Sequence, residues 1–290
     1  LNSTGAQNTA IGSQALNANT SASYNTAVGQ NALNGNTTGT RNTAVGALAL
    51  DAVTATNDNT AIGYAALSAN TSQNNTAVGR SALAASTTGN NNTAVGRLAM
   101  SNADVTGTNN VAVGYQALYA DTTGVDNIAI GGNTLVANTT GDYNVAIGKQ
   151  ALQTSTTVNA NTAVGYRALM TSAANINVAV GYDAMADSST AANCVAVGGY
   201  ALTDNTTGNN NVAIGYAAVQ LNTTGSGNVA VGYQVLRQNT TSSNNTGVGY
   251  QALTSNTTGD SNVAVGSYAL TTNTTAADNT AVGHVALQDN

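Results

Sequence analysis

The sequence predicts an all-β fold, a parallel β-solenoid (β-roll) of 17 rungs. One unit, N-T-A-V-G-Y-x-A-L-x-x-N-T-T-G-x-x, recurs with a period of 17 residues along the 290-residue chain. Hydrophobic residues make up 42% of the chain and recur at fixed positions of the unit, unlike those of a disordered polar chain. Both ends interrupt a unit, so we expect residues 1–290 to form a single array, a fragment of a longer one without caps.

The period is clearest in the pentad N-T/V-A-V/I-G. Its glycine recurs every 17 residues, except for spacings of 16 before Gly79 and Gly181 and of 18 before Gly114. At about 4.8 Å per rung, 17 rungs would make a rod about 80 Å long. The pentad glycines are Gly12, Gly29, Gly46, Gly63, Gly79, Gly96, Gly114, Gly131, Gly148, Gly165, Gly181, Gly198, Gly215, Gly232, Gly249, Gly266 and Gly283.

The pentad itself predicts the strand of each rung. The residue before the glycine is Val in 12 copies and Ile in five, and the residue two places earlier is Thr in nine, Val in seven and Ile in one. Side chains alternate along a strand, so these β-branched residues share a face, which we expect to point into the core. The Ala between them, replaced once by Gly247, would then face outward. A surface held to such small side chains implies close approach of another surface, so we expect identical chains to pack on this Ala stripe as a homotrimer.

Asn opens the pentad in 16 copies, and Cys194 takes its place once. Asn tolerates a left-handed backbone and suits a corner, and amides stacked at one phase would form a hydrogen-bonded ladder. In the N-T-T-G segment, as at Asn36 or Asn205, we expect a turn in which Gly provides a positive φ. The predicted ladder comprises Asn8, Asn25, Asn42, Asn59, Asn75, Asn92, Asn110, Asn127, Asn144, Asn161, Asn177, Asn211, Asn228, Asn245, Asn262 and Asn279.

The G-Y-x-A-L segment supplies a second core position. Its last residue is Leu in 14 copies, replaced by Met100, Met185 and Val219, and the preceding residue is Ala in 15. Because Ala and Leu favour helices, the sequence leaves open whether this segment is a strand or a helical turn.

Tyrosine recurs after the pentad glycine in seven copies and would form a broken aromatic stripe. Such a stripe either stacks on sugars or covers hydrophobic edges and packs between subunits. The seven residues are Tyr64, Tyr115, Tyr166, Tyr182, Tyr216, Tyr233 and Tyr250.

Composition and motifs argue against several function classes. The net charge is -6 and the cations form no basic stripe, so we expect no nucleic-acid binding. No apolar run is long enough for a membrane helix, so we expect no membrane insertion. The Asp residues occupy several phases, which predicts neither a metal site nor paired carboxylates. His284 and Cys194 lie in unrelated repeat positions, and we expect no cofactor and no enzymatic activity.

The repeated unit resembles the N-T-A-V-G-Y-x-A-L-x-x-N-T-T-G repeats of bacteriophage tail-fibre proteins. Its pentad is also similar to the N-S-V-A-I-G motif in the YadA-like head of trimeric autotransporter adhesins, a left-handed parallel β-roll with a shorter unit. Both resemblances cover the whole chain. They imply a homotrimer outside a bacterial cell or on a virion and no catalysis.

Three functions follow as hypotheses. The first is a structural fibre shaft that holds a receptor-binding or adhesive tip away from a virion or a bacterial surface. The second is an adhesin that binds host-surface glycans through its Tyr and Thr ladders. The third, ice binding, is disfavoured because the pentad Thr pairs across Ala with Val or Ile, so that no T-x-T array forms.

Overall fold

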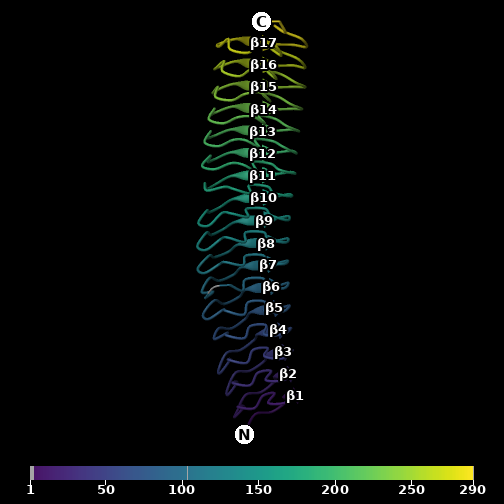
Figure 1. Cartoon of the computed structure of the whole chain (residues 1–290), viewed down its shortest axis with the longest axis vertical. Coiled ribbons are helices and arrows are strands. Elements are labelled where there is room, and N and C mark those ends of the chain that lie inside the picture. The colour runs from purple at the N-terminus through teal and green to yellow at the C-terminus, as the bar shows by residue number, and fades with distance from the viewer. Residues whose placement is uncertain (1–2, 103, 290) are drawn as a thin grey trace. The chain divides into compact units, whose positions relative to one another are not determined.

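The computed structural model describes residues 3–102 and 104–289, which form two compact units, residues 1–143 and 144–290. Each unit is a stack of similar coils, and each coil contains one three-residue strand (Figure 1). We name a coil after its strand and begin it at the pentad residue Asn or Cys194. Unit 1 holds β1 (Thr9–Ile11), β2 (Thr26–Val28), β3 (Thr43–Val45), β4 (Thr60–Ile62), β5 (Thr76–Val78), β6 (Thr93–Val95), β7 (Val111–Val113) and β8 (Ile128–Ile130). Unit 2 holds β9 (Val145–Ile147), β10 (Thr162–Val164), β11 (Val178–Val180), β12 (Val195–Val197), β13 (Val212–Ile214), β14 (Val229–Val231), β15 (Thr246–Val248), β16 (Val263–Val265) and β17 (Thr280–Val282).

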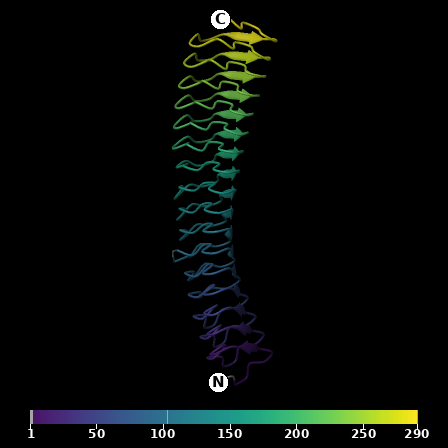
Figure 2. The ribbon, with the colours of Figure 1, turned by 45° about the vertical axis from the view of Figure 1, so that its right-hand side comes forward.

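Within each unit, every strand pairs in parallel and in register with the strand of the next coil. In unit 1, Ala10 lies beside Ala27, and the same pairing continues from β2 to β8. In unit 2 it runs from β9 to β17. The strands therefore lie one above another along one side of each unit (Figure 2). The all-β parallel solenoid predicted from the repeat is confirmed, and no helix occurs among the described residues.

The two faces of the strand are the reverse of those predicted. The middle alanines, such as Ala44 and Ala213, are fully buried, whereas the β-branched residues on either side, such as Val45 and Ile214, are partly exposed. The reason is the thinness of the coil. A Cβ on Gly247, at the middle position of β15, would lie 2.4 Å from Cγ1 of Val235 and 3.8 Å from Cδ1 of Leu253. The strand thus packs directly on the A-L pair of the opposite wall, which leaves room for no more than a methyl group.

This correction removes the proposed Ala stripe from the molecular surface. The surface of the strand wall is instead made of two ranks of side chains, one of Thr or Val and one of Val or Ile, with a single Ile at position 128 in the first rank. Any partner that contacts this wall would therefore meet β-branched side chains rather than alanine.

The G-Y-x-A-L segment is neither a strand nor a helix. It is a turn in which left-handed residues alternate with ordinary ones: Asn31 has φ of 58° and Leu33 has φ of 51°. The alternation sends successive N–H groups to different coils, since Asn31 donates to Ser13 O at 2.9 Å and Leu33 donates to Ala49 O at 3.0 Å. A left-handed leucine costs roughly 1–2 kcal/mol, which burial of its side chain offsets.

The residues that provide the positive φ angles also differ from those predicted. The left-handed corner residue is the one before the pentad Asn, such as Arg41 at 58°, and not the Asn itself. The N-T-T-G glycine is required for space, because a Cβ on Gly39 would lie 2.3 Å from Thr56 O of the next coil. The glycine with positive φ is the pentad one, for example Gly29 at +137°, where a Cβ would also lie 2.6 Å from the Gly46 backbone.

Candidate functional site

The pentad asparagines form a buried column that joins each coil to the next within a unit. The Asn25 Oδ1 accepts the backbone N–H of Asn42 at 2.9 Å, and its Nδ2 donates to Gly39 O at 2.8 Å. The same Oδ1 bond recurs at 2.8 to 3.1 Å in the other coils, as at Asn75 and Asn144. Only the side chains of Asn8 and Asn279, in the first and last coils, are half-buried. The pentad Asn side chains therefore bond mainly to backbone groups of the next coil, and less to one another.

A second column of asparagines, in the N-T-T-G turns, lies beside the first. The Asn36 Oδ1 accepts the N–H of Gly39 at 3.0 Å, and its Nδ2 donates to the Gly39 carbonyl at 3.0 Å. In unit 2 these amides also bond one another, Asn222 to Asn205 at 2.6 Å and Asn239 to Asn222 at 2.9 Å. From the sequence we expect only a turn in this segment. Its recurrent Asn at one phase, the same signal as in the pentad, marks a second amide ladder.

Asp121 occupies one position of this second column. It is fully buried, its Oδ1 accepts from Asn138 Nδ2 at 3.1 Å, and its Oδ2 has no partner among the described residues. Burial raises the pKa of this carboxyl from 3.8 to about 7, against the lowering effect of hydrogen bonds from Asn138 and the Gly124 N–H. Burial therefore favours the protonated form of this carboxyl below about pH 7.

Cys194 and His284 lie in different surroundings. Cys194 is buried in the pentad column, where Asn177 Oδ1 accepts its N–H at 2.9 Å and burial raises the pKa of its thiol. A thiol whose pKa is raised is a poor nucleophile at neutral pH. His284 packs edge-on against Tyr268, with ring centroids 6.4 Å apart. The structure does not bring these two residues together.

Five of the seven predicted stripe tyrosines join one aromatic ladder in unit 2, to which the structure adds two more. The additional residues, Tyr200 and Tyr268, stand one position further along the repeat and fill the gaps left at Gly199 and Ser267. Neighbouring tyrosine rings lie 5.2 to 5.7 Å apart, centroid to centroid. The ladder runs through Tyr166, Tyr182, Tyr200, Tyr216, Tyr233, Tyr250 and Tyr268 and ends at His284.

The stacking limits what the ladder can bind. Tyr216, Tyr233 and Tyr250 stack nearly parallel, with interplanar angles of 12° and 6° and centroids 5.5 and 5.2 Å apart. A sugar ring cannot enter between rings at this spacing, so the stacked residues present edges and hydroxyl groups to solvent. The parallel stack is interrupted at Tyr200 and Tyr268, whose contacts with the neighbouring rings are edge-on, with interplanar angles of 61°, 82° and 67°.

The two remaining stripe residues lie in unit 1 without an aromatic neighbour among the described residues. Each contacts an arginine instead: Arg80 lies 6.0 Å from the ring centroid of Tyr64, and Arg97 lies 5.7 Å from that of Tyr115. These are cation–π contacts at the outer limit of the useful distance.

The outward wall of strands is an uncharged surface that runs along each unit. Its outer rank is partly exposed in every coil, with Val45 at 37% and Ile62 at 41%. Neither rank contains a charged residue in any of the 17 repeats. Large uncharged aliphatic surfaces of this kind mark contact sites on soluble proteins.

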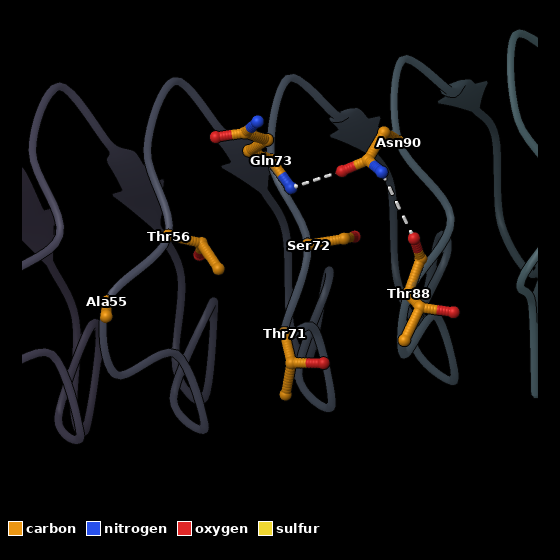
Figure 3. A pocket seen from close by; sticks show the side chains of 7 residues that line it. All are labelled: Ala55, Thr56, Thr71, Ser72, Gln73, Thr88 and Asn90. Atoms are coloured by element: carbon orange, nitrogen blue, oxygen red, sulfur yellow. Dashed lines mark hydrogen bonds between the residues drawn. The ribbon is translucent and has the colours of Figure 1, made fainter.

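A pocket of about 300 Å³ opens on the turn side of unit 1 (Figure 3). It lies between the β3, β4 and β5 coils, and its lining is uncharged, with polar and apolar surface in similar measure. The lining residues are Ala55, Thr56, Thr71, Ser72, Gln73, Thr88 and Asn90.

No cluster of His, Cys, Asp or Glu that could hold a metal ion occurs within the described part of the chain. The same part has no helix of the length and hydropathy needed to cross a bilayer. A comparison of the sequence with models of known protein families gives no match, and a comparison with curated proteins gives none either.

Proposed function

We propose that this chain is a structural shaft, a spacer that holds a receptor-binding or adhesive tip away from a virion or a bacterial surface. The observation that carries the proposal is the repetition of one set of coil-to-coil bonds in each unit. Within each unit, neighbouring coils are joined by an in-register strand, by turn N–H groups and, except at Cys194, by an Asn side chain bonded to backbone. A fold built in this way adds length with each repeat, and its stability is a sum over neighbouring coils.

The extracellular setting and the absence of catalysis belong to this proposal as well. They rest on the resemblance of the repeats to tail-fibre and adhesin-head sequences. The burial of the amide columns also suits exposure to proteases, because the turns are tied to the coils on either side by hydrogen bonds.

We further propose that the shaft is a homotrimer in which the outward strand wall packs on copies of itself. The correction of the strand faces moves the expected interface from alanine to the two β-branched ranks. The wall repeats at the spacing of the coils, so a second copy of the same chain matches it coil for coil. Its lack of charge also fits burial, since closed cyclic assembly would bring equivalent residues close together.

Electron microscopy of the whole chain tests the shaft, and native mass spectrometry tests the stoichiometry. The expected particle is a rod about 80 Å long, one strand width per repeat. Replacing Val45 and Ile62 by Lys should give monomers with an unchanged β-sheet circular dichroism spectrum. The same change at Gln30 and Tyr64, outside the two ranks, is the control. A compact particle would overturn the shaft, and a wild-type monomer would overturn the assembly.

Direct glycan binding through the aromatic ladder is the alternative from the adhesin class. Tyr200 and Tyr268, where edge-on contacts interrupt the parallel stack, are the places where a sugar could stack on a ring. A glycan array probed with the wild-type chain and with a Tyr200→Ala, Tyr268→Ala variant decides it. Binding lost in the variant supports this alternative, and an array without signal ends it.

Ice binding gains one observation from the structure. The wall of unit 1 places six threonines in six consecutive coils beside a rank of Val and Ile, facing outward rather than inward. Use of this wall for ice and its burial between copies exclude each other. A thermal-hysteresis measurement on the wild-type chain distinguishes the two. If the wall is buried in a homotrimer, as we propose, no thermal hysteresis is expected. The six residues are Thr9, Thr26, Thr43, Thr60, Thr76 and Thr93.

A further inference from the structure

The pocket in unit 1 exists because the β4 coil is one residue short. The consensus turn N-T-T-G becomes Asn70-Thr71-Ser72 in this coil, with Ser72 in the role of the glycine. The hydrogen bonds locate the missing residue: Asn70 Nδ2 reaches Ser72 O two residues on at 2.8 Å, whereas Asn36 reaches Gly39 O three residues on at 3.0 Å. The second threonine of the turn is therefore the residue that is absent.

The coils on either side keep their residues at this position, which leaves a notch between them. Ala55 of the β3 coil and Thr88 of the β5 coil stand at the position missing from the β4 coil, about 10 Å apart at two strand spacings. Their separation makes a pocket of about 300 Å³, at the lower end of the range for small-molecule sites.

The notch also leaves a backbone donor free. In the β2 coil, the N–H at this position, that of Thr38, donates to Thr54 O at 3.1 Å. The equivalent N–H of Ala55 makes no hydrogen bond with any described residue, because the short coil beside it lacks a matching turn. An exposed donor at the mouth of a pocket is a group that a ligand can satisfy.

The rest of the lining offers further donors and acceptors without charge. The Gln73 carboxamide and the Thr88 hydroxyl have no partner among the described residues, although the Gln73 N–H donates to Asn90 Oδ1 at 3.0 Å (Figure 3). Below them Ser72 Oγ donates to Gly89 O at 2.7 Å and accepts from Asn75 Nδ2 at 2.9 Å, so it forms the floor of the pocket and its hydrogen bonds are made within the chain. Free groups of both kinds in one uncharged pocket match a ligand rich in hydroxyl groups.

We propose that this notch binds one neutral sugar residue, such as the terminal unit of an uncharged glycan. The Ala55 N–H and the Gln73 amide donate to sugar oxygens, and Thr88 Oγ1 and the Gln73 carbonyl accept from sugar hydroxyls. The Ala55 methyl group contacts the apolar face of the ring. The site is separate from the aromatic ladder of unit 2, and it does not depend on the shaft proposal.

The chain contains its own control for this inference. The β10 coil is also 16 residues long from one pentad glycine to the next. In it Ala174 takes the place of Ser72, because Asn161 Nδ2 donates to Ala174 O at 3.1 Å as Asn59 Nδ2 donates to Ser72 O at 2.9 Å. There Ala173 stands where the β4 coil has Thr71. The same deletion therefore occurs without the free carboxamide of Gln73, because Asn175 stands at that position and its Oδ1 accepts the Asn159 N–H at 2.7 Å. We expect this second short coil to bind no sugar.

Two-dimensional NMR of the ¹⁵N-labelled whole chain, titrated with glucose, galactose, mannose and N-acetylglucosamine, tests the proposal. At least one sugar should give saturable shifts confined to residues 54–57, 71–73 and 87–90, with a dissociation constant on the order of 1 mM. Insertion of one threonine between Thr71 and Ser72 restores the consensus turn, and it should weaken binding at least about tenfold while leaving the spectrum of unit 2 unchanged.

Thr88→Val, on an exposed side chain, should weaken binding without changing the fold. Saturable shifts that persist in the insertion variant, or that appear equally at residues 171–175, would overturn the proposal. So would tighter binding of N-acetylneuraminic acid than of any neutral sugar, or no saturable shift with any of the four. Because the particle length is measured separately, failure here leaves the shaft proposal standing.

Discussion

Val235 occupies the space that the side chain of residue 247 would otherwise fill: a Cβ on Gly247 would lie 2.4 Å from Val235 Cγ1. In the β14 coil Val replaces Ala in the A-L pair, and in β15 Gly replaces the middle Ala of the strand. One exchange adds volume to the core and the other removes it, so the pair preserves the packing between the two walls.

The first prediction is a double-mutant cycle on this pair. Gly247→Ala should destabilise the chain by about 1–3 kcal/mol through overpacking, and Val235→Ala by about 2 kcal/mol through lost burial and a cavity. The double variant restores the alanine pair of the other coils and should be nearly as stable as the wild type. Hydrogen exchange of the β14 and β15 amides measures the effect locally, and additive losses would contradict the packing described.

The second prediction concerns Asp121 and pH. Its pKa in the folded chain, about 7, lies above the value of 3.8, so the folded state binds more protons than the unfolded state between these values. Stability should therefore fall as the pH rises from about 4 to 7 and level off above, by up to about 4 kcal/mol in the coil concerned. Asp121→Asn, which restores the consensus residue, should remove this dependence.

Amide exchange of the β7 and β8 coils at pH 5 and pH 8 measures the change. The Asp126→Asn variant, with an acid at an exposed corner one position before a pentad Asn, is the control and should not alter the pH profile. An equal profile in wild type and Asp121→Asn would show that the carboxyl does not titrate in this range.

The third prediction concerns the gap in the pentad column at Cys194. The sulfur replaces an amide that elsewhere bonds both the next pentad N–H and a turn carbonyl, as Asn228 bonds Asn245 N–H at 3.0 Å and Ser242 O at 2.9 Å. Cys194→Asn should raise the free energy of unfolding by about 1 kcal/mol, and the reverse change, Asn228→Cys, should lower it by about 1–3 kcal/mol. Thermal unfolding under reducing conditions checks both; a Cys194→Asn variant with a lower melting temperature would count against the ladder as a source of stability.

The fourth prediction separates the structural from the binding role of the aromatic ladder. Tyr233→Ala removes two stacked contacts and should destabilise unit 2 by about 1–3 kcal/mol, whereas Tyr233→Phe should be nearly neutral. Tyr24→Ala, at a residue 61% exposed with no ring contact among the described residues, is the control and should change little. Unfolding midpoints in urea measure the differences, and equal effects at Tyr233 and Tyr24 would mean that stacking contributes no stability.

The repeat sequence was sufficient to predict the architecture, but it was insufficient to predict which side chains form the core. Period, pentad and turn residues predicted a parallel solenoid with a strand at the pentad of each coil, because a residue repeated at one phase must recur at one place in every coil. They left open whether the G-Y-x-A-L segment is a second strand or a helical turn. The direction of the strand faces was predicted wrongly. The period of two shows which residues share a face, but it does not show which face is inside.

The space available between the two walls of the coil decides which face of the strand is buried. Bulky β-branched residues are usually buried, yet here the opposite wall, with Leu33 or Leu253 in a left-handed turn, stands too close to admit them, and alanine is what fits. The distance between the two walls depends on the positive φ angles of the Leu and of the residue two places before it. The conformational propensities of these residues do not predict such angles.

By itself the sequence determined the number and length of the coils, the place of the pentad strand in each and the phase of the pentad amide column, since these follow from periodicity alone. Only the tertiary structure decided which side of the strand faces solvent, that seven tyrosines and a histidine form one ladder, and that a deletion in the β4 coil opens a pocket. The physical reason is that each of these depends on distances between neighbouring coils and opposite walls, which exist only once the chain has closed on itself.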